Sequence, residues 1–383
     1  MISLEIAATI AFFGVVGALL VIDRKNVQFQ YGIILRKWKF GVEAIDRLVG
    51  KTKKFLTNVG DVSICLGLVA GLVGIAFLFY SIVSVQQSFM LVLPTVGSFR
   101  YPGPVLSIPF WYWLIGVFVI ITSHESMHAV FARLAKVPIK TYGIITLLVL
   151  PIGAFVDPDM KKVKKLKLAE KLRIYSAGSF ANLVVGFLVF LIAFASFSMF
   201  GALTESVGIK IGSTISGTPA HEVGVSGILY KIDNTSINST QGLSLFMEKI
   251  LPGENLTLYT TEGIFPIKTI NHPENKSLPF MGIGNLTNVY RYKRMFTGYV
   301  PETVLNGIFV WLNLLSWLLV LNIGVAIFNM LPVRPLDGGL IYEEIFKKKF
   351  GRKGKKIMRI VELTMLALII FNLFIMYLIR TFI

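Results

Sequence analysis

Long apolar stretches alternate with short polar segments along most of the chain. A helix needs about 20 apolar residues to cross the hydrocarbon core of a bilayer. The pattern therefore predicts an α-helical polytopic membrane protein with about six transmembrane helices. The six stretches are Ser3–Ile22, Val62–Val85, Pro109–Leu134, Ile174–Phe200, Val304–Leu331 and Leu363–Ile379.

Two further apolar stretches contain helix breakers. Tyr142–Val156 is interrupted by Pro151 and Gly153, and we expect both of its ends on the same side of the membrane. Non-helical backbone at membrane depth is tolerated only against protein or water, so this stretch is predicted to be a re-entrant or interfacial loop near a functional site. Leu91–Phe110, which contains four prolines, is expected to be its counterpart on the opposite side.

The stretch from Gly201 to about Val289 has a different pattern. It is polar and contains short β-rich runs, such as Ile228–Ile232 and Leu256–Thr260, with a turn signal at Pro252-Gly253. This predicts a small mixed α/β domain inserted between membrane helices. The chain then divides into an N-terminal helix pair with its loops, the first half of a membrane core, the inserted domain, and the second half of the core with a last helix. The predicted ranges are 1–108, 109–200, 201–302 and 303–383.

Composition supports the membrane assignment and excludes some chemistry. Of the 383 residues, 54% are hydrophobic and 15% are charged, whereas soluble globular chains carry about 25% charged residues. The one cysteine, Cys65, lies inside an apolar stretch. A disulfide framework and a cysteine-based metal site are therefore excluded.

The positive charge is concentrated in three short segments. The net charge is +17, and 24 of the 38 Lys and Arg residues lie in Asp23–Gly60, Lys161–Arg173 and Lys347–Arg359. Basic residues in short loops mark the cytoplasmic side of a membrane protein. We therefore expect these segments in the cytoplasm, beside the lipid bilayer, and the inserted domain on the extracytoplasmic side of the cell membrane. The distribution argues against a nucleic-acid partner.

The third apolar stretch carries the candidate chemistry, in the sequence His124-Glu125-Ser126-Met127-His128. Residues four apart share a face of a helix, so both imidazoles can reach one metal ion. Zinc suits two nitrogens, one carboxylate oxygen and an open position. The metal would acidify a water and polarise a scissile carbonyl, while Glu125 would act as the catalytic base. Ionisable groups in a membrane helix are costly unless they are paired or metal-bound, which favours a functional site.

A catalytic zinc needs a third protein ligand. The fifth apolar stretch ends in Asn329-Met-Leu-Pro-Val-Arg-Pro-Leu-Asp-Gly-Gly339, in which Asp337 is the one carboxylate. The predicted topology brings the end of this stretch to the same side as the histidines. A helix end with Asp337 facing water is the alternative at this point.

These motifs resemble the site-2 protease family of intramembrane metalloproteases. The likeness extends to Arg173–Asn182, which is similar to the motif that opens that family's next core helix, and to Pro151–Val156, which is similar to its loop after the metal helix. The family usually has Gly-Pro where this chain has Gly178-Ser179. The resemblance implies one Zn²⁺ per chain, bound by His124, His128 and Asp337, with Glu125 as base. It also implies that Asn182 stabilises the oxyanion or positions the substrate.

The resemblance also implies partners and a setting. The expected substrates are membrane-spanning proteins, already trimmed by another protease, in regulated intramembrane proteolysis. Within the inserted domain, Gly217–Gly224, Ile228–Ile237 and Leu251–Glu254 resemble a PDZ domain, although the usual Gly-Asp near Gly227 is missing. PDZ domains bind extended peptides by strand addition.

Two other functions fit the same residues. One is a membrane-anchored zinc protease whose site lies in a soluble region, with a glutamate as third ligand, for which Glu170 is the nearest candidate. The other is a transporter or metal sensor with an intramembrane His–Glu site. An intact glutamate between the histidines favours hydrolysis, because a binding site alone needs no base.

Overall fold

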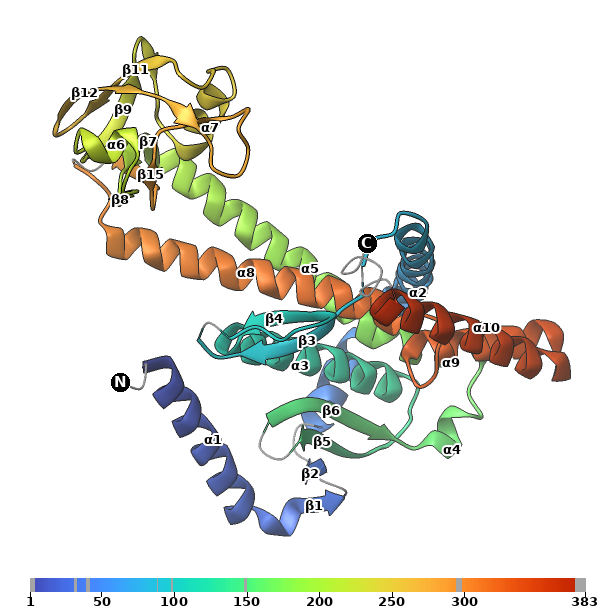
Figure 1. The fold of residues 1–383 in the computed structure, drawn as a ribbon. Helices are drawn as coiled ribbons and strands as arrows, with labels where there is room; N and C mark the ends of the chain where they lie inside the picture. Colours follow the sequence, from blue (N-terminus) through green and yellow to red (C-terminus); the bar gives the residue numbers. More distant parts are fainter. Residues whose placement is uncertain are drawn as a thin grey trace. The chain divides into compact units, whose positions relative to one another are not determined.

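The computed structural model describes residues 4–30, 33–38, 42–87, 89–97, 99–147, 150–293 and 298–375. The chain separates into two compact units. The first comprises residues 1–192 and 314–383, and the second comprises residues 193–313. Figure 1 shows the elements of both units.

Six of the described helices are long and apolar enough to cross a membrane, as predicted, and the chain is a multi-pass membrane protein. Several begin earlier than the apolar stretches, because the basic residues before them are good helix formers and continue the helix. The predicted end of the last span, near Ile379, lies outside the described residues. The six are α1 (Leu4–Ile22), α2 (Val42–Val83), α3 (Phe110–Leu134), α5 (Leu168–Leu203), α8 (Glu302–Asn329) and α10 (Arg352–Ile370), which continues into the π-helix η2 (Phe371–Ile375).

The stretch Tyr142–Val156 is non-helical, as expected, but it forms a β-hairpin and not an irregular loop. Its strands belong to an antiparallel sheet of order β1-β2-β5-β6. The other two strands, β1 and β2, come from the basic segment after α1, and Ile33 of β2 pairs with Leu147 of β5. The strands are β1 (Val27–Gln30), β2 (Ile33–Trp38), β5 (Ile139–Leu147) and β6 (Leu150–Pro158), and the short 3-10 helix η1 (Arg24–Asn26) precedes them.

The proline-containing stretch before α3 forms two short parallel strands, β3 (Leu91–Thr95) and β4 (Val105–Pro109). Prolines lack the backbone donor that a central strand needs, and a two-stranded pair has only edge strands. Strand β4 leads directly into α3, whose first residue, Phe110, is buried.

Helix α2 presents glycines to the end of α8. Side chains added at Gly67, Gly71 and Gly74 would collide with Met330, with its backbone, or with Ile327. Small residues let membrane helices approach closely, and here they seat the end of α8 against α2. The turn that follows α8 leads into α9 (Asp337–Phe350), and α4 (Met160–Val163) precedes α5.

The second unit contains a sheet of order β12-β11-β9-β7-β16, with β10 paired to β9. Inward-facing side chains such as Ile209, Leu229 and Leu258 are fully buried and form its core. Each predicted β-rich run contains a strand. The elements are β7 (Thr204–Lys210), β8 (Ser213–Thr214), α6 (Pro219–Glu222), β9 (Ile228–Ile232), β10 (Thr235–Ser236), α7 (Thr240–Met247), β11 (Asn255–Thr260), β12 (Gly263–Lys268), β13 (Ile270–Asn271), β14 (Pro279–Phe280), β15 (Ile283–Gly284) and β16 (Thr287–Tyr292).

Candidate active site

Helix α3 places His124 and His128 one turn apart on the same face. Their ring centroids are 4.7 Å apart. The Nδ1 atom of His128 lies 2.7 Å from the carbonyl oxygen of Ile174 on α5. The Nδ1 atom of His124 lies 3.1 Å from the amide nitrogen of Asn182, also on α5. Both imidazoles therefore contact α5 through Nδ1 and leave Nε2 for another partner.

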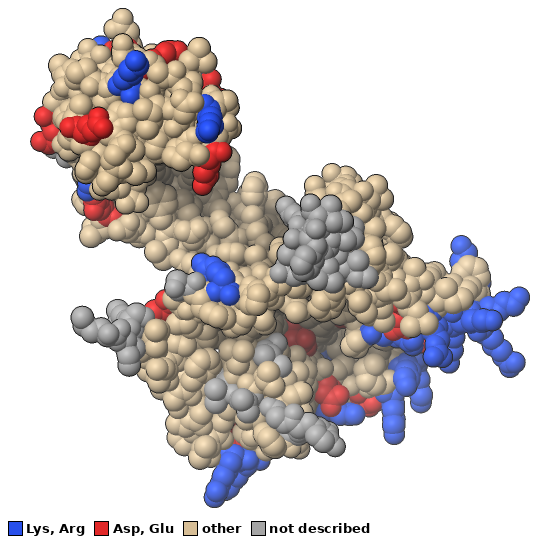
Figure 2. Space-filling view, in the orientation of Figure 1, with Lys and Arg blue, Asp and Glu red and all other residues tan. Residues whose placement is uncertain are grey.

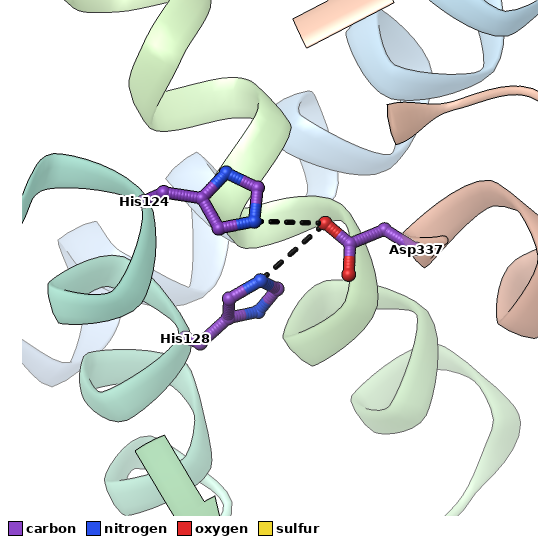
Figure 3. A group of neighbouring side chains, drawn as sticks. All are labelled: His124, His128 and Asp337. Carbon is purple, nitrogen blue, oxygen red and sulfur yellow. Dashed lines mark ion pairs between the residues drawn. The ribbon is translucent and has the colours of Figure 1, made fainter. Parts of the chain in front are cut away.

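That partner is Asp337, the first residue of α9, whose carboxylate faces both imidazoles (Figure 3). Its Oδ2 atom is 3.3 Å from Nε2 of His124 and 3.4 Å from Nε2 of His128. The next two residues are glycines because side chains at Gly338 and Gly339 would overlap the backbone of Met330 and Val333. The Asp-Gly-Gly sequence thus allows α9 to start tightly against the end of α8.

The electrostatic surroundings keep Asp337 ionised. Burial disfavours the charged carboxylate, but the charge and the contacts of His128 and His124 outweigh this effect. The pKa of Asp337 therefore lies below its ordinary value. A metal ligand must be deprotonated, and the Asp337 carboxylate meets this requirement.

The three residues could hold a metal ion. One ligand atom from each of His124, His128 and Asp337 can be chosen so that all lie within 4.8 Å of one another. Two imidazole nitrogens and one carboxylate oxygen, with a position left open, are the donor set of a catalytic zinc site. The residues present therefore fit Zn²⁺.

Glu125 lies on α3 beside this group and faces a large apolar cavity. Its Oε2 atom accepts a hydrogen bond of 2.8 Å from the backbone nitrogen of Val156 on β6. The cavity has a volume of about 1020 Å³ and is lined by α1, α3, β5 and β6, with Phe12, Phe118 and Phe155 among its walls. Glu125 thus lines the cavity and is the neighbour of His124 on α3.

Comparisons with known proteins decide the family. The sequence profile described as Peptidase family M50 matches residues 112–372, which include every candidate site residue. The chain belongs to peptidase family M50. This confirms the resemblance to the site-2 protease family.

Similar proteins cover most of this M50 chain. An uncharacterised protein of Methanocaldococcus jannaschii is 30% identical over 356 residues, which are 89% of this chain and 86% of that protein. A protein of Clostridium perfringens with the name "Putative zinc metalloprotease" is 22% identical, over 61% of this chain and 86% of its own. A Fusobacterium nucleatum protein with the same description is also 22% identical, over 62% of this chain and 89% of its own.

Within this M50 fold, the rival third ligand lies elsewhere. Glu170 accepts a hydrogen bond from the backbone nitrogen of Lys167 and lines a pocket with Lys53 and Arg173. Among the described residues, the group that could hold a metal contains Asp337 and not Glu170. Asn182 contacts His124 directly, and its role is considered below.

Sequence reasoning missed three features of this site. Ser123 donates a hydrogen bond to Asn182, and a side chain at Gly178 would overlap the ring of His124. Lys171, buried at the start of α5, forms a 2.9 Å ion pair with Glu344 on α9. A lysine so close to an apolar stretch was the one signal available, because the other two features depend on how α3 and α5 pack.

Proposed function

We propose that this M50 peptidase is an intramembrane zinc metalloprotease of the site-2 type, which cuts membrane-spanning substrates in regulated intramembrane proteolysis. The observation that carries the proposal is the convergence of His124, His128 and Asp337 within 4.8 Å, next to Glu125 and an apolar cavity. The relatives named as zinc metalloproteases support zinc as the metal.

His124, His128 and Asp337 would hold the zinc. When bound, zinc supplies Lewis acidity that activates water and polarises the scissile carbonyl. Glu125 takes the proton from the attacking water and returns it to the leaving amine nitrogen. The hydrogen bond from the Val156 backbone orients the Glu125 carboxylate for both transfers.

The cavity indicates the kind of substrate. Its walls are mostly aliphatic and aromatic side chains from α1 and α3, which suit an apolar segment. A helical segment hides its carbonyls in hydrogen bonds, so a substrate must unwind before it is cut. Strand β6 lies at one end of the sheet, and an unwound segment can lie extended beside it. Prior trimming by another protease would leave a single membrane segment free to enter.

The second unit is proposed to be a PDZ-like domain on the extracytoplasmic side that holds or selects substrates. Its sheet with short flanking helices and the resemblance of Gly217–Gly224 support this role. The concentration of Lys and Arg in three short segments supports this orientation, which places those segments on the cytoplasmic side of the cell membrane. Figure 2 shows Lys and Arg side chains gathered over α9 and α10, where one of these segments lies.

Replacement of Asp337 tests the proposed site against the alternative in which Glu170 is the third ligand. We expect Asp337→Ala to lose most of its zinc and its cleavage of a membrane-spanning substrate, because one of three protein ligands is removed. Glu170→Ala is the matched control and should keep both, since Glu170 bonds to Lys167 instead. Zinc per chain is measured by elemental analysis of the purified protein. Full zinc and activity in Asp337→Ala, or their loss in Glu170→Ala, would refute the proposed site.

A further inference from the structure

Asn182 lies in a short chain of hydrogen bonds that ends at His124. It is fully buried on α5. Its amide nitrogen is 3.1 Å from Nδ1 of His124, and its amide oxygen accepts a 3.1 Å hydrogen bond from Ser123. The Ser123 hydroxyl is also 2.9 Å from the carbonyl oxygen of Val119 and 3.1 Å from that of Ile120. Both ends of the Asn182 amide therefore contact residues of α3.

A histidine that binds a metal through Nε2 carries its proton on Nδ1, and this proton needs an acceptor. His128 meets the requirement because its Nδ1 atom faces the carbonyl oxygen of Ile174, which can only accept. For His124, the group facing Nδ1 is an amide, which can either donate or accept. When the amide nitrogen faces Nδ1, it donates to Nδ1, and the imidazole proton is on Nε2. After a half-turn, the amide oxygen faces Nδ1 and accepts from a proton carried on Nδ1.

Ser123 allows that half-turn with each end of the amide still facing a partner. After the half-turn, the Asn182 oxygen accepts from Nδ1 of His124, and the Asn182 nitrogen faces the Ser123 hydroxyl. The hydroxyl can accept from it and donate its own proton to the carbonyl of Val119 or Ile120. Buried polar groups need such partners, and the Asn182 oxygen and nitrogen each keep one in the state that frees Nε2.

We propose that Asn182, supported by Ser123, is a positioning residue that fixes the proton of His124 on Nδ1 and directs its Nε2 lone pair toward the metal. This inference rests on the proposed zinc site. It replaces the role in oxyanion stabilisation that the family resemblance implies, because the nitrogen and the oxygen of the buried amide both contact residues of α3. The two histidines are thus held by different groups, a backbone carbonyl for His128 and a side-chain amide for His124.

Zinc affinity tests this role without relying on turnover. We expect Asn182→Leu to bind zinc about 10- to 100-fold more weakly, the usual effect of removing a partner of a metal-bound histidine. Asn182→Asp should bind zinc nearly as well as the wild type, because a carboxylate also accepts from Nδ1. Competition with a chromophoric chelator gives the affinities. Asn322→Leu is the matched control, since Asn322 is equally buried and its amide nitrogen donates a hydrogen bond to Leu318 of its own helix.

The zinc-loaded variants separate the two roles of Asn182. If Asn182 donated to an oxyanion, Asn182→Asp and Asn182→Leu would both keep wild-type zinc affinity and lose about 10²–10³-fold in turnover. That result would overturn the positioning role, whereas an active, zinc-loaded Asn182→Asp would support it. If Asn182→Leu does not fold, Asn182→Ala takes its place. Failure of the proposed zinc site would give a different result. In that case the wild type and Asp337→Ala would contain the same amount of zinc.

Discussion

At the scale of single residues, the candidate site depends on the absence of a side chain at position 178. Helix α5 passes so close to α3 that a methyl group on Gly178 would overlap the imidazole of His124. A ring held by Asn182 on one side cannot move aside without losing that hydrogen bond. The glycine is therefore part of the site although it binds nothing.

We expect Gly178→Ala to lower zinc content and activity, because the added methyl group displaces His124. Gly201→Ala is the control, since it lies on the same helix and a side chain there meets nothing within 4 Å. Alanine is also the better helix former by about 1 kcal/mol, so a loss at position 178 cannot come from helix propensity. Equal zinc content in the two variants would contradict the close approach of α5 to His124.

The sequence predicted the residues whose roles follow from spacing along one helix. His124, Glu125 and His128 were recognisable because a helix repeats every 3.6 residues, and Asp337 because it is the one carboxylate in the segment after α8. Ser123 and Gly178 were not recognisable, because their roles arise only from the packing of α3 against α5. A serine or a glycine in an apolar helix has many ordinary explanations.

At the scale of elements, a partly buried ion pair joins α9 to α5. Lys171 is 7% exposed and its ammonium lies 2.9 Å from the carboxylate of Glu344. Glu344 follows Asp337 by two turns of α9, and Lys171 precedes Ile174 by about one turn of α5. The pair therefore connects the helix that carries Asp337 to the helix that contacts both histidines.

Breaking the Lys171–Glu344 ion pair should weaken the packing of α9 against α5. We expect Glu344→Gln to lower the midpoint of thermal unfolding and to weaken zinc binding, because Lys171 would remain buried without a counter-ion. Removing one partner of a fully buried pair costs about 3–5 kcal/mol, and the partial exposure of Glu344 makes a smaller loss the expected result. Exchange of the charges, Lys171→Glu with Glu344→Lys, should restore part of the loss. Unchanged unfolding and zinc binding in Glu344→Gln would show that the pair does not hold α9.

The helices were predictable from the sequence, whereas the sheet beside the site was not. Apolar length alone identified all six spans, because a bilayer sets that length. The prolines and glycines of Tyr142–Val156 predicted a break in helical structure, but not the pairing of Ile33 with Leu147. Pairing between strands so distant in sequence depends on tertiary packing, which local composition does not encode.

At the scale of the whole molecule, the charge distribution predicts one orientation in the membrane. We expect the three basic segments on the cytoplasmic side and the second unit on the other side, because basic residues in short loops mark the cytoplasmic side. All five Asn-x-Ser/Thr sequences of the chain lie in the second unit, and their asparagines are exposed there, as an extracytoplasmic surface would allow. They are Asn234, Asn238, Asn255, Asn275 and Asn285.

Single cysteines can test this orientation. In a Cys65→Ala background, we expect an impermeant thiol reagent on intact cells to label a cysteine at Ser226 and not one at Lys353. Both positions are exposed, so access from one side of the membrane decides the result. Labelling after the cells are opened serves as the control and should occur at both positions. Labelling of intact cells at Lys353 alone would show the opposite topology. It would also contradict the proposed route of substrate entry.

The central claim is that Glu125 serves as the base of a zinc protease. The most direct test is the turnover of Glu125→Gln relative to the wild type at equal zinc content, with a membrane-spanning substrate in liposomes. We predict that Glu125→Gln keeps its zinc, since His124, His128 and Asp337 remain, and loses about 10²–10⁴-fold in turnover. A zinc-loaded Glu125→Gln that retains more than about 1% of wild-type turnover would contradict the claim.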